Sequence, residues 1–93
     1  MSIYVDELAD WGWVMYGKTI QSCHMVTDGD MEELHKFAES IGLKRSYFQD
    51  GTKPHYDLTP KRRAKAIEMG AVRIGRHELV ELFREQKKKD AAL

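Results

Sequence analysis

The chain has 93 residues, of which 42% are hydrophobic and 32% are charged, and its formal net charge at pH 7 is zero. This length predicts a single domain with a modest core, and the composition excludes an intrinsically disordered chain. No segment approaches the ~20 consecutive apolar residues that a membrane-spanning helix requires, so we expect no membrane association.

The first part of the chain predicts two short strands with an irregular segment between them. Residues 3–5 are β-branched and aromatic, which indicates a strand that ends at Asp6. Residues 7–20 contain two tryptophans and two glycines without clear periodicity, and they predict a loop or a bent hairpin. Residues 22–26 indicate a second strand, which stops at the turn residues 27–29.

The clearest helix follows at residues 30–41. Asp30 with Glu33 three positions later matches a capping box, in which the two side chains accept from free backbone N–H groups of the first turn. Gly42 then provides a left-handed helix end. The apolar residues at three- and four-residue spacing are Met31, Leu34, Phe37, Ala38 and Ile41.

The second half predicts two further helices and at least one strand. Residues 44–58 either add a strand or stay irregular, and Thr59 before Pro60 is a typical helix start. This helix runs to about Met69. Its expected solvent face carries Lys61, Arg62, Arg63 and Lys65, and its expected inward face carries Ala64, Ile67 and Ala71. Residues 71–74 predict a strand, and Gly75-Arg76 opens a third helix.

This order of elements predicts an α/β fold: a small layered sheet of three to four strands, mostly parallel, with about three helices. We expect residues 1–86 to form one domain and residues 87–93 to fray as a basic tail. Ligands of open parallel sheets bind beyond the carboxyl ends of the strands. Asp6, Asp28 and Arg76 follow predicted strands, so we expect them at that edge.

The distribution of charge bears on the expected partners, and the cysteine content bears on the expected cellular compartment. Residues 1–43 carry two basic and eight acidic side chains, a net charge of −6, whereas residues 44–93 carry thirteen basic and seven acidic, a net charge of +6. This division suits a positive surface for phosphate, or pairing with the opposite half of the same chain or of a second copy in a homodimer. The first ten residues resemble no secretory signal, and the lone Cys23 forms no internal disulfide, so we expect a cytoplasmic protein.

The pentapeptide 55–59, His-Tyr-Asp-Leu-Thr, is the strongest candidate for chemistry. Its His55 and Asp57, together with His24, are the expected catalytic groups, because imidazole and carboxylate transfer protons near neutral pH. Asp6 and Asp57 are expected oxygen ligands of Mg²⁺ or Mn²⁺. The expected ligand-binding residues are Arg45, Gln49, Tyr56, Arg62 and Arg76. The spacing matches no zinc motif, P-loop or dinucleotide fingerprint.

Each of these residues also has a structural interpretation. His55 can bond a backbone carbonyl, Asp57 can cap the turn before Pro60, and Tyr56 can belong to the core. His24, in a strand, can be a buried and satisfied histidine. These alternatives are separated by geometry, because a site requires Asp6, His24, His55 and Asp57 to converge within ~6 Å.

Several blocks of the sequence resemble one known family. The blocks are residues 4–6, 22–24, 33–38, 41–43, 48–49, 55–57 and 70–71. In order and spacing they are similar to a small bacterial and phage family catalogued as domain of unknown function 4031. The resemblance spans about residues 3–75 and implies no activity. It does imply that Asp6 and the pentapeptide belong to the shared pattern, whereas residues 11–17 and the lysine-rich tail lie outside it.

Two classes of function follow from the residues. The first is a metal-dependent phosphoesterase or nuclease, in which Asp6 and Asp57 bind the metal, His55 or His24 moves protons, and Arg62 or Arg76 stabilises the developing charge. The second is a non-catalytic module that binds a nucleotide, a nucleic acid or a protein. Both interpretations favour a polar site for a phosphate-bearing ligand, either a small molecule or a nucleic acid.

Overall fold

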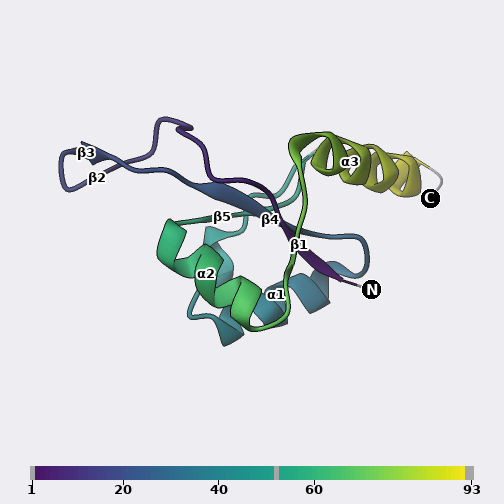
Figure 1. Ribbon diagram of the computed structural model, residues 1–93. Helices are drawn as coiled ribbons and strands as arrows, with labels where there is room; N and C mark the ends of the chain where they lie inside the picture. Colours follow the sequence, from purple (N-terminus) through teal and green to yellow (C-terminus); the bar gives the residue numbers. More distant parts are fainter. Residues whose placement is uncertain (1, 52, 92–93) are drawn as a thin grey trace.

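The computed structural model describes residues 2–51 and 53–91, and Figure 1 shows the chain as a sheet between helices. The elements in chain order are β1 (Ile3–Val5), β2 (Val14–Met15), β3 (Lys18–Thr19), β4 (Cys23–Thr27), α1 (Met31–Ser40), the 3₁₀ turn η1 (Arg45–Tyr47), β5 (Tyr56–Leu58), α2 (Pro60–Glu68), β6 (Val72–Arg73) and α3 (Arg76–Ala91).

The main sheet has four strands in the order β5-β4-β1-β6. This confirms the α/β class and the expected number of strands and helices, but the expectation of mainly parallel pairing is wrong. Within this sheet β1 and β6 pair parallel, whereas β1–β4 and β4–β5 pair antiparallel. A helix between two neighbouring strands usually carries the chain back to the edge where the first strand began, so that the second strand runs parallel to it. Here the long link of residues 41–55 follows α1 and carries the chain across to the opposite edge again. Consequently β5 enters against β4, with Tyr56 opposite Met25 and Leu58 opposite Cys23.

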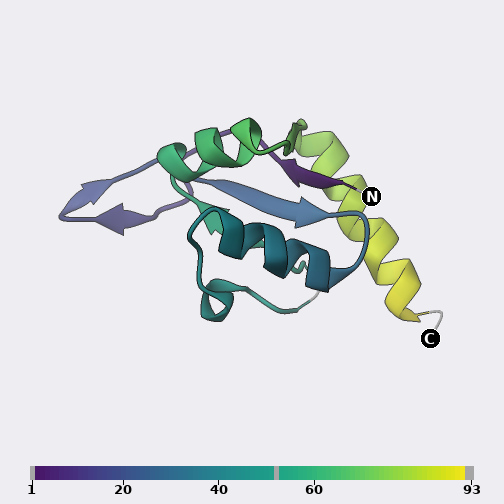
Figure 2. The same ribbon diagram turned by 90° about the horizontal axis from the view of Figure 1, so that it is seen from below.

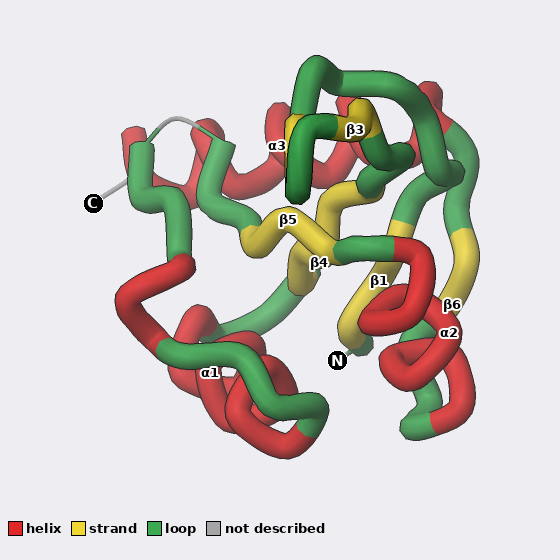
Figure 3. The backbone as a smooth tube through the Cα atoms, turned by 90° about the vertical axis from the view of Figure 1, so that its left-hand side faces the viewer, coloured by secondary structure: helices red, strands yellow, loops and turns green. Residues whose placement is uncertain are grey.

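The two faces of the sheet pack against different helices, as Figures 1 and 3 show. Side chains alternate between the faces of a strand. On one face, core residues of β1, β4 and β5 pack with residues of α1 and α2: Val5, Cys23, Met25, Tyr56, Leu58, Leu34, Ala38 and Ala66. On the other face, Val26 forms a smaller cluster with Ile74 and Leu79 at the start of α3. The sheet is therefore the middle layer of three.

The strands β2 and β3 form a hairpin that projects from the body of the molecule, as Figure 2 shows. Its two turn residues have positive φ, 54° at Tyr16 and 76° at Gly17. Two such residues between paired strands are the mark of a type I′ turn, whose twist matches that of the strands. The bent hairpin expected within residues 7–20 is confirmed.

The predicted helix starts are confirmed by their caps. The Asp30 carboxylate accepts from the Glu32 N–H at 3.0 Å, and the Thr59 hydroxyl accepts from the Arg62 N–H at 3.2 Å. The inward face of α2 differs from the expectation, because Ala66 is buried while Ala64 is exposed. Residues three to four apart share a helix face, and the buried face includes the half-buried Arg62 and Arg63.

The helix α3 extends to Ala91 and so covers most of the segment that was expected to fray, while residues 92–93 of that segment lie outside the described residues. Among the helices of the described ranges, none combines the length and the apolar composition needed to cross a membrane.

Candidate functional site

The candidate site is a row of polar side chains across three neighbouring strands. His24 on β4 lies directly opposite Asp57 on β5. Asp6 follows β1, and its N–H donates to the His24 carbonyl at 3.2 Å. His55 precedes β5 by one residue and shares a face with Asp57, because strand side chains alternate. The row lies on the face that carries α3, where Val26, two residues beyond His24, packs with that helix.

Asp6 fixes His24 from the backbone and from the ring. Asp6 is 3% exposed, and its Oδ1 accepts from the His24 N–H at 2.6 Å. Its Oδ2 lies 3.0 Å from His24 Nδ1. An ionised carboxylate only accepts hydrogen bonds, so Nδ1 carries the ring proton and Nε2 keeps its lone pair in the neutral imidazole. Such a carboxylate–histidine pair is the usual support of a metal-ligating histidine.

The two ring nitrogens of His55 also have different partners. Nδ1 lies 2.6 Å from the carbonyl oxygen of Lys53, which can only accept, so Nδ1 carries a proton. Nε2 lies 3.2 Å from Asp57 Oδ1. The other oxygen of Asp57 accepts from the Gln49 side-chain amide. Since Nε2 of a neutral His55 and the Asp57 carboxylate would present lone pairs to each other, the pair requires a cation between them. That cation is a proton or a metal ion.

The pKa values agree with a proton between the two side chains. Burial acts against the charged form of His55, but the hydrogen bonds with Asp57 and the Lys53 carbonyl outweigh it and raise the pKa of His55. The bond with His55 lowers the pKa of Asp57, although burial opposes this shift. Both shifts therefore favour the form of the pair in which His55 is an imidazolium and Asp57 a carboxylate.

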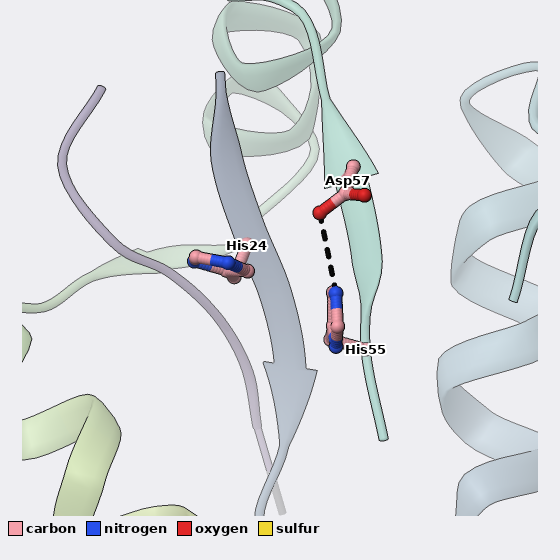
Figure 4. A group of neighbouring side chains, drawn as sticks. All are labelled: His24, His55 and Asp57. Atoms are coloured by element: carbon pink, nitrogen blue, oxygen red, sulfur yellow. Dashed lines mark ion pairs between the residues drawn. The ribbon is translucent and has the colours of Figure 1, made fainter. Parts of the chain in front are cut away.

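Figure 4 shows how His24 joins this pair. One ligand atom from each of His24, His55 and Asp57 lies within 4.8 Å of the others, and all three residues are partly buried. The rings of the two histidines meet edge to face, with 5.0 Å between their centroids. Asp6 lies outside the three, but its carboxylate is 3.0 Å from the His24 ring and so adjoins the group through that residue.

Two cavities flank the group. The larger, of about 550 Å³, is lined by His24 and lies between the sheet and α3. Its four cations are Lys53, Arg76, Arg84 and Lys87, and its apolar side is formed by Trp11, Leu79, Val80 and Phe83. The smaller, of about 400 Å³, is lined by Asp57 and Gln49, with Trp13 and Arg62 among its other walls. The two cavities thus border different members of the group, His24 and Asp57.

The remaining sequence-predicted residues divide between the site and the scaffold. Arg76 lines the larger cavity, Gln49 bonds Asp57, and Arg62 lines the smaller cavity while donating to the Ile41 carbonyl. Tyr56 is fully buried on the opposite face of β5, where its hydroxyl lies 2.7 Å from His35 Nδ1. Tyr56 therefore does not join the group.

Arg45 lies away from the group, on the side of α1. Its guanidinium lies 2.5 Å from a Glu32 oxygen and 4.0 Å from a Glu39 oxygen. Asp28 also lies apart, because it follows β4, whose end is the opposite end of the antiparallel pair from Asp6. Asp28 accepts from the Ser2 N–H at 2.8 Å and from the Tyr4 hydroxyl at 3.0 Å. The expectation that Asp28 shares an edge with Asp6 and Arg76 is wrong, since it rested on parallel strands.

Sequence reasoning missed contributions from three regions. The Lys53 carbonyl fixes the His55 ring, Arg63 Nε donates to the Asp6 carbonyl at 2.9 Å, and the Trp11 ring lies 5.1 Å from the His24 ring. The basic residues of α2 include Arg63, so its part in the site could have been suspected from the sequence. The position of the Lys53 carbonyl could not, because a backbone carbonyl is common to every residue. The apolar residues of α3 predicted packing and gave no sign of a cavity wall.

Comparison with known proteins gives a family without an activity. Residues 3–86 match the family described as Protein of unknown function (DUF4031), and because this is most of the chain, the protein belongs to that family. The comparisons with curated proteins and with solved structures gave no match.

Proposed function

We propose that this member of the DUF4031 family is a metal-dependent phosphoesterase, which binds a divalent transition-metal ion through His24, His55 and Asp57. The observation that carries the proposal is the His55 ring. Its Nδ1 is committed to the Lys53 carbonyl, and its Nε2 faces a carboxylate at 3.2 Å. A divalent cation in place of the proton would accept both lone pairs.

The ligand types favour a metal ion that accepts nitrogen. Two imidazoles and one carboxylate suit Zn²⁺, Mn²⁺ or Fe²⁺, whereas Mg²⁺ prefers oxygen ligands and retains its waters. Of the two ions expected from the sequence, Mn²⁺ therefore fits this group better than Mg²⁺. Three protein ligands also leave positions for water and for a substrate oxygen, which is the arrangement of catalytic rather than structural sites.

The reaction assigned to the site is hydrolysis of a phosphate ester. A bound metal ion lowers the pKa of its water and polarises a phosphoryl oxygen. The water oxygen forms a bond to phosphorus, the bond from phosphorus to the ester oxygen breaks, and the leaving oxygen takes up a proton while the water loses one to solvent. Asp6 holds the His24 ring in the ligating tautomer, and Arg76 offers paired N–H donors to the phosphate oxygens.

The charges near the group support phosphate as the substrate's reacting part. The cavity that His24 lines carries four basic side chains, and no carboxylate lines it among the described residues. Basic side chains around a partly enclosed site attract phosphate and neutralise the charge that develops on it.

Calorimetric titration of Zn²⁺, Mn²⁺ and Mg²⁺ into the metal-free protein tests the first half of this proposal. We expect one ion per chain for Zn²⁺ and Mn²⁺, weaker binding of Mg²⁺, and loss of binding in His55→Gln. His77→Gln is the matched control, because His77 is an exposed histidine of α3 outside the group. Metal binding that persists in His55→Gln would contradict the assignment.

Turnover tests the second half. The metal-loaded protein should hydrolyse one or more of a panel of phosphomonoesters, phosphodiesters and single-stranded nucleic acids, and Asp57→Asn should abolish turnover while the protein stays folded. A protein that binds metal and hydrolyses none of the panel would refute the enzyme assignment.

The second candidate is a non-catalytic binding module for a phosphate-bearing ligand. One observation favours it: a single proton satisfies the His55–Asp57 pair, so the group is also stable as a structural ion pair. This candidate predicts that the wild-type protein binds no stoichiometric metal and hydrolyses no phosphate ester, whereas a lower free energy of unfolding in Asp57→Asn is expected for both candidates.

A further inference from the structure

We propose that the ligand of the larger cavity is a nucleotide unit, with its base stacked on Trp11 and its phosphate held by Arg76 beside the metal group. This inference deepens the proposed function and rests on it for the position of the reacting phosphate. It concerns the class of ligand, a phosphate bonded to a sugar that carries a nucleobase.

The Trp11 ring is held in place and still accessible. It is 48% exposed, its edge-to-face partner is the His24 ring at 5.1 Å, and the Arg76 guanidinium lies 5.1 Å from its centroid. An exposed indole that is already fixed by two neighbours loses little freedom when a flat ring stacks on it. The contact with His24 also places this surface next to a proposed metal ligand.

The cations that line this cavity are largely available to an anion. Arg84 pairs with Glu81 at 3.3 Å. Arg76, Lys53 and Lys87 form no ion pair with a carboxylate of the described residues. A guanidinium that stacks on an indole keeps its N–H edge for a phosphate, so Arg76 can contact the base platform and the phosphate together.

The apolar side of the cavity indicates more than a free phosphate. Leu79, Val80 and Phe83 form a wall on α3, and the Phe83 ring lies 6.5 Å from the His55 ring. Inorganic phosphate would leave this wall and the indole without contacts. The cavity's volume of about 550 Å³ falls within the range of small-molecule sites, and a flat base with its sugar uses the wall while its phosphate uses the cations.

Fluorescence anisotropy with labelled oligonucleotides tests the inference on the full chain, with a chelator present so that no hydrolysis occurs. The probes are oligo-dT, an abasic oligonucleotide of the same length, and a labelled thymidine monophosphate. The first two separate the base from the phosphates, and the third distinguishes a mononucleotide from a strand. Trp11→Ala is compared with Trp13→Ala, because Trp13 lines the other cavity. Arg76→Gln is compared with Arg73→Gln, an exposed arginine of β6.

We expect oligo-dT to bind more tightly than the abasic strand, and Trp11→Ala to weaken oligo-dT binding roughly 5- to 140-fold, the range that the loss of one stacked base produces. The abasic strand should bind Trp11→Ala as tightly as it binds the wild type. If two phosphates are held, the logarithm of the affinity should fall with the logarithm of salt concentration with a slope of about −1.4, and Arg76→Gln should reduce that slope by about 0.7. Trp13→Ala and Arg73→Gln should bind as the wild type does.

Equal binding of the abasic strand and oligo-dT, or no effect of Trp11→Ala, would overturn the inference, as would binding of none of the three probes. Because the assay contains no metal, its failure is distinct from a failure of metal binding or turnover. Nucleotide binding without a metal site would refute the phosphoesterase and leave the ligand assignment standing.

Discussion

In both His24 and His55 an oxygen acceptor fixes the proton on Nδ1, but the kind of acceptor differs. A buried carboxylate fixes Nδ1 of the first ring, and a backbone carbonyl fixes Nδ1 of the second. Both histidines are thereby held in the tautomer whose Nε2 can bind a metal. The sequence alternatives for His55, a bond to a carbonyl or a role in a site, do not exclude each other, because the carbonyl bond is what orients the ring.

Asp6→Asn should weaken metal binding without removing it. The single amide oxygen of Asn can accept only one of the two bonds that Asp6 accepts from His24, and the negative charge that raises the basicity of the imidazole is lost. We expect a decrease of metal affinity of roughly 10- to 100-fold, the usual effect of such a supporting group, measured by calorimetric titration. Asp50→Asn, a change at an exposed carboxylate in the link before β5, is the control. An unchanged affinity in Asp6→Asn would show that Asp6 serves only the fold.

The His55–Asp57 pair predicts a window of pH in which it stabilises the metal-free protein. The pKa of His55 is raised from 6.5, so its contribution is full below pH 6.5 and is lost as pH rises through the higher folded value. The pKa of Asp57 is lowered from 3.8, so its contribution is full above pH 3.8 and is lost as pH falls through the lower folded value.

The difference in free energy of unfolding between the wild type and His55→Gln should therefore be largest between about pH 3.8 and 6.5 and should shrink toward pH 9. Urea unfolding at a series of pH values, with chelator present, measures it. A difference that grows with pH would contradict the protonated pair.

At the scale of the elements, the site depends on strand register. His24 and Asp57 meet because β4 and β5 pair antiparallel with these residues opposite each other, and Asp6 continues the row from β1. The sequence predicted the strands at residues 3–5 and 22–26 and the two capped helix starts, because β-branched residues, Asp30 and Thr59-Pro60 are local signals. Strand direction is not a local property. The path of residues 41–55 sets the direction of β5 against β4, and the path of residues 6–22 sets the direction of β4 against β1, on which the placement of Asp28 depends.

The hairpin offers a test of local geometry that is independent of the site. Tyr16 has a φ of 54° and is 96% exposed, so it bears left-handed strain without contributing to a core. Type I′ turns favour Asn before Gly. Tyr16→Asn should therefore raise the free energy of unfolding by about 1 kcal/mol, which denaturant titration measures. A decrease in stability would indicate that the exposed phenol makes contacts that this turn geometry does not account for.

At the scale of the whole molecule, the two cores are unequal. The face with α1 and α2 buries most of the apolar residues, while α3 is held by the small cluster of Val26, Ile74 and Leu79. The residues of α3 that we propose to bind the ligand thus lie on the less firmly packed layer, as is common for elements that move when a ligand binds. The sequence predicted α3 as a helix, but its apolar residues alone could not show that it covers only part of the sheet.

Hydrogen exchange should detect the difference in packing between the two faces of the sheet. We expect amides of α3 to exchange through an opening of lower free energy than that of the β4 amides, because fewer buried side chains hold the helix. An oligonucleotide that occupies the larger cavity should slow exchange in α3 more than in α1. Equal protection of α3 and β4 would contradict the expected order.

In the function proposed for this protein, His24, His55 and Asp57 together hold one metal ion. The most direct measurement is anomalous X-ray diffraction from crystals grown with Mn²⁺ or Zn²⁺. We expect a single strong anomalous peak at about 2.0–2.3 Å from a ring nitrogen of each histidine and a carboxylate oxygen of Asp57. A map with no peak at this position, and with His55 Nε2 still 3.2 Å from Asp57 Oδ1, would contradict it.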